Sequence, residues 1–263
     1  MPKRKLRLLI LSFIFFGSTA SSALAHDYWI IPDTFHPPEN SMVGVAFSSG
    51  HSYFGSVETP DITKYRLNLL TPEGWELPLA YSRVDPKAAR AMVPVFGHGT
   101  YIIGTSSIRP SYWSKTTEGW VPEPKSRAKN VVEGGKYVKS VKTFLTVGNA
   151  SDSYKRILGY KIEIVPQKNP AALKPGHSLP LLVLYRGRPV RDATVFAVYE
   201  GYKPAEKGTY PVNTKTDMNG IARLRLNRPG KWLIGAKYQF DTPGNPNADY
   251  ENYRAYIMFE IKK

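Results

Sequence analysis

The sequence predicts an all-β protein with two immunoglobulin-like or transthyretin-like β-sandwich domains after a cleaved signal peptide. Short runs alternate apolar and polar residues with period two, as Tyr160, Ile162 and Ile164 do against Lys161 and Glu163. Between these runs stand 22 prolines and 21 glycines, and no long segment has the 3.6-residue period of an amphipathic helix. Many short strands separated by turn residues are typical of a sandwich.

The remaining strand candidates are spread along the chain. Residues 109–140 are the least strand-like part and carry Trp113 and Trp120, so we expect an irregular insertion there in the first sandwich. Prolines and glycines between Pro166 and Gly176 interrupt the pattern, which predicts two domains, 26–165 and 166–263. The expected strands lie at residues 43–48, 65–70, 101–105, 142–147, 160–164, 181–185, 194–199, 221–226, 232–238 and 253–261.

The first 25 residues have the pattern of a secretory signal peptide. Four basic residues up to Arg7 precede an apolar stretch at 8–16, and Ala23-Leu24-Ala25 has the small-x-small pattern that signal peptidase recognises. The apolar stretch is shorter than the roughly 20 residues of a membrane-spanning helix. We therefore expect cleavage after Ala25, a mature chain that begins at His26, and a periplasmic location.

Charge and composition narrow the classes of function. Lys and Arg outnumber Asp and Glu by 36 to 21, and removal of the signal would lower the formal charge from +15 to +11. Such a surface could face nucleic acid, but export argues against that partner. The absence of cysteine excludes thiolate metal sites and cysteine nucleophiles. No nucleophile elbow, P-loop, dinucleotide fingerprint or zinc-protease helix motif is present, so we do not expect an enzyme.

A histidine at the new N-terminus suggests a metal site. A free α-amine has a pKa of about 7.7–8.0, so a metal can displace its proton at neutral pH. The amine and the imidazole Nδ1 of His26 could then chelate one ion, and His51, in a loop between Gly50 and Gly55, could add a second imidazole. Nitrogen ligands suit divalent nickel, cobalt, copper or zinc better than magnesium or calcium.

The other candidates are weaker. Asp27 follows His26 directly, and His98 stands between two glycines in a loop, so both are further candidates for the metal site. His36 and His177 stand beside prolines or linker residues and are expected at the surface. The sequence leaves open which metal binds and the oligomeric state.

Several short motifs follow one another along the chain: HDYWIIP at 26–32, GHSYFG at 50–55, YIIG at 101–104, FLTVG at 144–148 and ADYE at 248–251. Together they resemble a family of exported bacterial proteins of largely undefined function, described as periplasmic components of cobalt or nickel uptake systems. The resemblance implies that His26 and His51 bind nickel or cobalt and that a membrane metal-uptake transporter is a partner. The sequence departs from the family at Ser52, where glycine is common.

The second domain carries a resemblance of its own, and two other functions stay open. The order GRPVRDA at 187–193, TDMNG at 216–220 and PGKW at 229–232 resembles surface-protein B-type and carboxypeptidase-regulatory-like modules, which usually act as spacers. One alternative is therefore a structural or adhesive module without metal. The other is a copper-dependent oxidase with a histidine brace, in which the aromatic residues of 109–140 would line a binding face.

Overall fold

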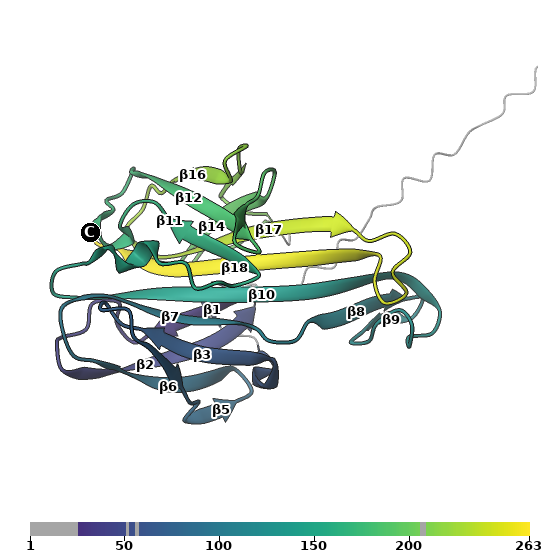
Figure 1. Cartoon of the computed structure of the whole chain (residues 1–263), viewed down its shortest axis with the longest axis horizontal. Coiled ribbons are helices and arrows are strands. Elements are labelled where there is room, and N and C mark those ends of the chain that lie inside the picture. The colour runs from purple at the N-terminus through teal and green to yellow at the C-terminus, as the bar shows by residue number, and fades with distance from the viewer. Residues whose placement is uncertain (1–25, 51–52, 56–57, 206–208) are drawn as a thin grey trace, which may run out of the picture.

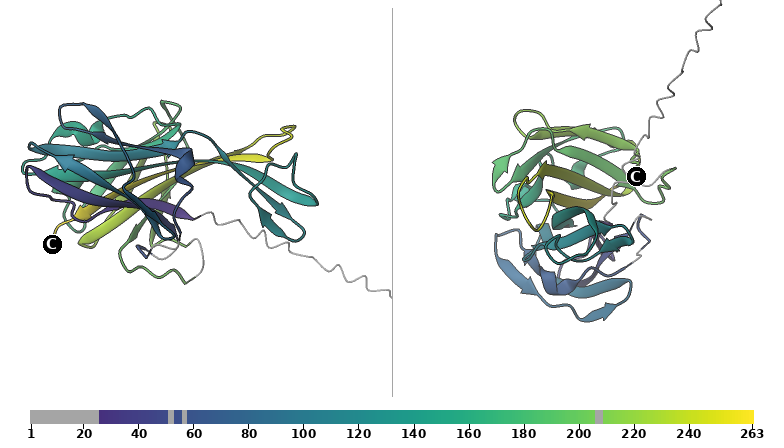
Figure 2. Two further views of the ribbon diagram at one scale, coloured as in Figure 1. Left: turned by 90° about the horizontal axis from the view of Figure 1, so that it is seen from below. Right: turned by 90° about the vertical axis from the view of Figure 1, so that its right-hand side faces the viewer.

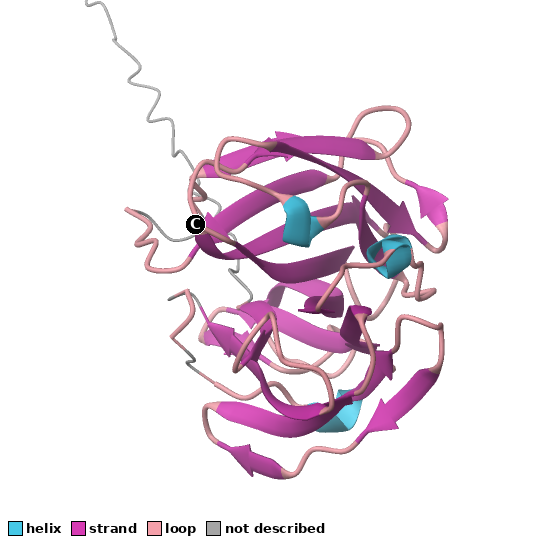
Figure 3. Cartoon of the chain, turned by 90° about the vertical axis from the view of Figure 1, so that its left-hand side faces the viewer, coloured by secondary structure: helices cyan, strands magenta, loops and turns pink. Residues whose placement is uncertain are grey.

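The computed structural model describes residues 26–50, 53–55, 58–205 and 209–263, and it is all-β. Strands and three short 3-10 helices make up the secondary structure of these residues, as Figure 3 shows by colour. Each expected strand overlaps an observed one, and the predicted fold class is confirmed. No helix in the described ranges is long and apolar enough to cross a membrane.

The first sheet holds the start of the described chain. It is antiparallel, with the order β1-β2-β6-β5. Its strands are β1 (Asp27–Pro32), β2 (Ser41–Gly50), β6 (Ala88–Val95) and β5 (Arg83–Asp85).

The second sheet is the largest and forms the centre of the molecule. Its order is β15-β14-β17-β18-β10-β7-β3-β4. In addition, β8 pairs with β10, and β9 pairs with β8. Its first strands are β3 (Tyr65–Leu70), β4 (Glu76–Leu79), β7 (Gly99–Ser107), β8 (Ser111–Thr116), β9 (Gly119–Val121) and β10 (Val131–Val147). The others are β14 (Thr194–Tyr199), β15 (Val212–Lys215), β17 (Gly230–Asp241) and β18 (Tyr250–Ile261).

The third sheet covers the opposite side of the central one. It has the order β11-β12-β13, with β16 paired to β12. Its strands are β11 (Ile162–Pro166), β12 (Ser178–Tyr185), β13 (Arg188–Pro189) and β16 (Ile221–Arg225). The short helices are η1 (Ile62–Lys64), η2 (Asp152–Lys155) and η3 (Pro170–Ala172).

The central sheet is shared by two hydrophobic cores, one on each face. On β18, Ile257 and Phe259 pack toward the third sheet, whereas Tyr256 and Met258 pack toward the first sheet. Figure 1 shows the same layering, with the first sheet below β10 and β18 and the third sheet above them. A strand that is buried on both faces is mostly apolar, as β18 is from Ala255 to Phe259. The parallel pair β10–β18 thus joins residues from both sides of the boundary expected at 165/166 into one sheet.

The segment 109–140, expected to be irregular, contains β8, β9 and the first half of β10. These strands and the β17–β18 end form an arm that projects beyond both sandwiches (Figure 1, Figure 2). In this arm, Gly135 of β10 pairs with Tyr250 of β18. A Cβ at position 135 would lie 2.6 Å from the Tyr250 ring, so only glycine fits there without a shift of that ring. The sequence pattern is weak here because a projecting ribbon has little core against which to alternate apolar and polar residues.

Candidate functional site

The first strand brings the chain neighbours of the two predicted histidine ligands together. β1 runs antiparallel to β2, and the last pair of this ladder is Asp27 with Gly50. His26 precedes Asp27 and is described by the structure, whereas His51 follows Gly50 and lies outside the described residues. The described part of the site therefore consists of His26 and the groups around it.

The imidazole of His26 faces a carboxylate that the sequence interpretation did not name. His26 Nδ1 lies 2.6 Å from Glu58 Oε1, and the two side chains are 29% and 51% exposed. Glu58 reaches this position because its backbone forms an isolated antiparallel bridge with Ser49 of β2. The Ser49 hydroxyl also donates to Glu58 Oε1 at 3.3 Å.

Asp27 has a different environment from His26, although the two are adjacent in the chain. Its carboxylate is 1% exposed and accepts hydrogen bonds from the hydroxyls of Tyr53 at 2.5 Å, Tyr256 at 3.0 Å and Tyr210 at 3.3 Å. The guanidinium of Arg254, on β18, lies 3.7 Å away. The carboxylate that the sequence offered as a metal ligand thus holds the start of β1 to the central sheet.

The tyrosines around Asp27 remain hydrogen-bond donors over a wide pH range. Burial, and after it the negative charge of Asp27, raises the pKa of the Tyr53, Tyr210 and Tyr256 hydroxyls. A neutral phenol donates to a carboxylate, and a phenolate would repel it. The network is therefore a fixed support for the strand that begins at Asp27.

Lys139 of β10 holds the backbone of His26 from the other side. Its ammonium donates to the His26 carbonyl oxygen at 2.9 Å and lies 3.6 Å from the centre of the Tyr28 ring. The side chain is buried, and burial, with a further contribution from Arg254, lowers its pKa well below the usual value. Two buried basic side chains, those of Lys139 and Arg254, therefore contact the start of β1.

His98 lies at the other end of the first sheet. It follows β6, whose last residue, Val95, pairs with Ser41 at the start of β2. Gly50, near His26, is the last residue of the ten in β2, so the two ends are about 30 Å apart at ~3.4 Å per residue. His98 Nε2 lies 3.5 Å from a carboxylate oxygen of Glu39. The structure does not bring His98 and His26 together.

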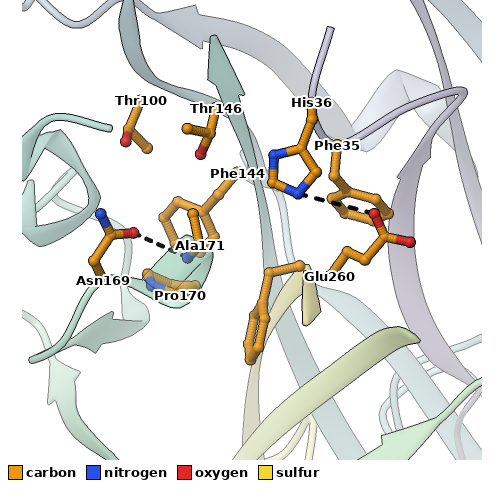
Figure 4. A pocket seen from close by; sticks show the side chains of 10 residues that line it. Phe35, His36, Thr100, Phe144, Thr146, Asn169, Pro170, Ala171 and Glu260 are labelled. Carbon is orange, nitrogen blue, oxygen red and sulfur yellow. Dashed lines mark hydrogen bonds and ion pairs between the residues drawn. The ribbon is translucent and has the colours of Figure 1, made fainter. Parts of the chain in front are cut away.

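A small pocket that is partly open to solvent lies between the two hydrophobic cores and is lined in part by His36. Its lining comes from both cores and from η3, as Figure 4 shows. The Nε2 atom of His36, which was expected at the surface, is buried without a hydrogen bond and lies 3.9 Å from Glu260. Burial, together with the charge of Lys262, lowers the pKa of His36. This pocket offers one imidazole and one carboxylate, without the α-amine that the predicted cleavage would add at His26.

Within the described ranges, no three His, Cys, Asp or Glu side chains converge as metal ligands. The proposed donor set does not need three of them, because it includes an α-amine and His51. The imidazole of His26 and the carboxylate of Glu58 are both ordinary ligands of divalent transition metals. The described part of the site therefore fits such an ion.

Sequence reasoning missed Glu58, Lys139, Arg254 and the three tyrosines. Only Glu58 left a signal, since it is an acidic residue seven positions after His51 in a basic chain. Lys139, Arg254 and Tyr256 come from strands more than 100 residues away from His26, and Tyr53 and Tyr210 come from loops. Their meeting depends on the pairing of β10 with β18 beneath β1.

Comparisons with solved structures give only distant similarities. A DUF4785 family protein from Legionella pneumophila has a TM-score of 0.27 and 8% identity, over 79% of this chain and 52% of that one, so the chain spans about half of its length. A two-domain fibronectin type III segment of chicken tenascin has a TM-score of 0.23 and 12% identity, over 90% of this chain and 98% of that one. The D00–D0 domain of intimin has a TM-score of 0.21 and 12% identity, over 90% of this chain and 100% of that one. These similarities concern the fold alone.

No curated protein matches the sequence. A family profile does match, over residues 23–239, which is most of the chain and includes His26, Glu58 and Lys139. The chain therefore belongs to the DUF4198 family, whose description is a domain of unknown function.

Proposed function

We propose that this protein is a periplasmic binding protein for a divalent transition metal, nickel or cobalt in the first place and copper or zinc next. The α-amine and imidazole of His26 and the imidazole of His51 hold the ion. The protein does not transform it, and passes it to a membrane metal-uptake transporter.

The Asp27–Gly50 pair carries this proposal. Asp27 follows His26 in the chain, and Gly50 precedes His51. The two stretches of sequence that supply the predicted ligands therefore meet at the Asp27–Gly50 pair. The Nδ1 atom of His26 is already turned toward a metal-ligating type of group, the Glu58 carboxylate.

The surroundings of His26 favour an ordered ligand. Lys139 fixes the His26 carbonyl, and the network around Asp27 fixes the next residue. A ligand that is held in place before binding loses less conformational freedom when the ion arrives, which strengthens binding. The ring itself is partly exposed, so an ion can reach it from solvent.

The N-terminus is the sharpest point at which to test the proposal. Processed protein that begins at His26 is titrated with Ni(II), Co(II), Cu(II) and Zn(II), next to a form with one glycine added before His26. We expect the added residue to weaken binding at least about tenfold, which corresponds to about 1.4 kcal/mol, because it removes the amine from the chelate.

Two controls accompany this titration. A His51→Ala variant should also lose affinity, and a His177→Ala variant should not. Equal affinities of the processed and extended forms would refute the amine as a ligand. Oxygen reduction by the copper-loaded protein with a reductant would instead favour the histidine-brace oxidase.

A further inference from the structure

We infer that Glu58 supplies an oxygen ligand to the ion held by His26, so that the site combines nitrogen donors with one carboxylate. This inference deepens the proposed function and rests on it. It concerns only His26, Ser49 and Glu58, which the structure describes.

The first support is the spacing of the two donor atoms. Metal–nitrogen and metal–oxygen bonds to histidine and carboxylate are about 2.0–2.2 Å, so neighbouring ligands at a right angle on one ion lie about 2.8–3.1 Å apart. His26 Nδ1 and Glu58 Oε1 are 2.6 Å apart. A shift of a few tenths of an ångström brings both atoms onto one ion, without a change in the path of the chain.

The second support is that the chain holds Glu58 at this place. The Ser49 amide donates to the Glu58 carbonyl at 3.0 Å, and the Glu58 amide donates to the Ser49 carbonyl at 3.3 Å. Ser49 is fully buried, and its single hydroxyl proton lies within hydrogen-bond reach of both the carbonyl and the carboxylate of Glu58. A carboxylate fixed through a buried strand residue has the character of a preorganised ligand.

The third support is the balance of charge. An ion of charge +2 with only neutral nitrogen ligands would keep its full charge close to Lys139, the buried basic residue whose Nζ donates to the His26 carbonyl. Asp27 cannot offset that charge as a ligand, because its carboxylate is engaged by Arg254 and three tyrosines. Glu58 places one negative charge directly beside the His26 ring, where it lowers the electrostatic cost of binding.

Glu58→Gln tests the inference in protein that begins at His26. The substitution keeps size and polarity, and Glu58 is half-exposed, so the fold is expected to persist. The matched control is Glu39→Gln, which changes the other exposed His–Glu pair of the same sheet. The probes are Ni(II) and Cu(II) salts in competition with a chelator, and the readouts are the dissociation constant and the electron paramagnetic resonance spectrum of the Cu(II) form.

We expect Glu58→Gln to weaken binding about 10- to 100-fold and to change the parallel hyperfine splitting of bound Cu(II). Ser49→Ala should weaken binding by less, and Glu39→Gln should change neither readout. Unchanged affinity and spectrum in Glu58→Gln would overturn the inference, and so would tighter binding, which would make Glu58 a competitor for Nδ1. Wild-type protein that binds no metal would refute the proposed function itself, whereas equal binding with an extra N-terminal residue would refute only the α-amine as a ligand.

Discussion

Two histidines near opposite ends of β2 each lie beside a glutamate, but the side chains packed behind the two pairs differ. His26 Nδ1 is 2.6 Å from Glu58, and His98 Nε2 is 3.5 Å from Glu39. The His98 pair is more open, with side chains 58% and 46% exposed. Behind His26 lie a buried lysine on its carbonyl and a buried carboxylate network at the next residue. A histidine beside an acid is common on a surface, and buried support is what marks one of the two as a candidate site.

The difference also has an energetic side. Exposed ion pairs contribute about 0–1 kcal/mol, whereas removal of one partner from a buried, hydrogen-bonded pair costs several kcal/mol. Substitutions in the buried groups beside His26 should therefore lower the free energy of unfolding, and substitutions in the His98 pair should not. Substitutions at the two ends should separate these cases.

The largest effect is expected from Asp27→Ala. The change removes the carboxylate that faces Arg254 and accepts three phenol hydrogen bonds, so the free energy of unfolding should fall by about 3–5 kcal/mol. Urea denaturation measures it. Glu39→Ala is the control and should change the same quantity by less than about 0.5 kcal/mol. A loss below about 1 kcal/mol for Asp27→Ala would mean that the buried network is not a support.

The next effect depends on pH. Burial raises the pKa of Tyr65, whose ring packs beside Tyr28 and Phe47, to about 12. A tyrosine in an unfolded chain has a pKa of about 10, so between pH 10 and 12 the unfolded chain releases this proton and the folded chain keeps it. Stability is therefore fully present below pH 10 and falls as pH rises, by up to about 1.4 kcal/mol per pH unit for each such phenol.

Tyr65→Phe should reduce this alkaline slope by up to that amount. Denaturant unfolding at several pH values between 9 and 11.5, for the wild type and the variant, measures the slope. Equal slopes would show that Tyr65 ionises alike in the folded and unfolded chains.

The smallest effect is expected at the His98 end. His98→Ala removes an exposed ring that faces the exposed Glu39. Unfolding free energy should change by less than about 0.5 kcal/mol, and the dissociation constant for Ni(II) by less than about twofold. Titration calorimetry and urea denaturation provide the two values. A large loss of Ni(II) affinity in His98→Ala would show that the metal binds near His98 and not at His26.

Local pattern alone accounts for much of the strand content. The strand expected at 65–70 matches β3, and the one at 194–199 matches β14, because period-two alternation and flanking turn residues are local properties of the chain. The sequence did not suggest β1 as a strand, and it did not reveal the strands within 109–140. β1 follows directly on the predicted signal, and the arm strands pack against little core.

The candidate site divides in the same way. The sequence by itself determined the all-β class, the predicted cleavage before His26 and the choice of His26 and His51, because residue types and their spacing carry that information. Only the tertiary structure decided that Asp27 turns inward, that Glu58 meets His26, and that Lys139 and Arg254 lie behind them. The physical reason is distance along the chain: these contacts form when β10 and β18 pair in parallel beneath β1, and no local pattern encodes which distant strands become neighbours.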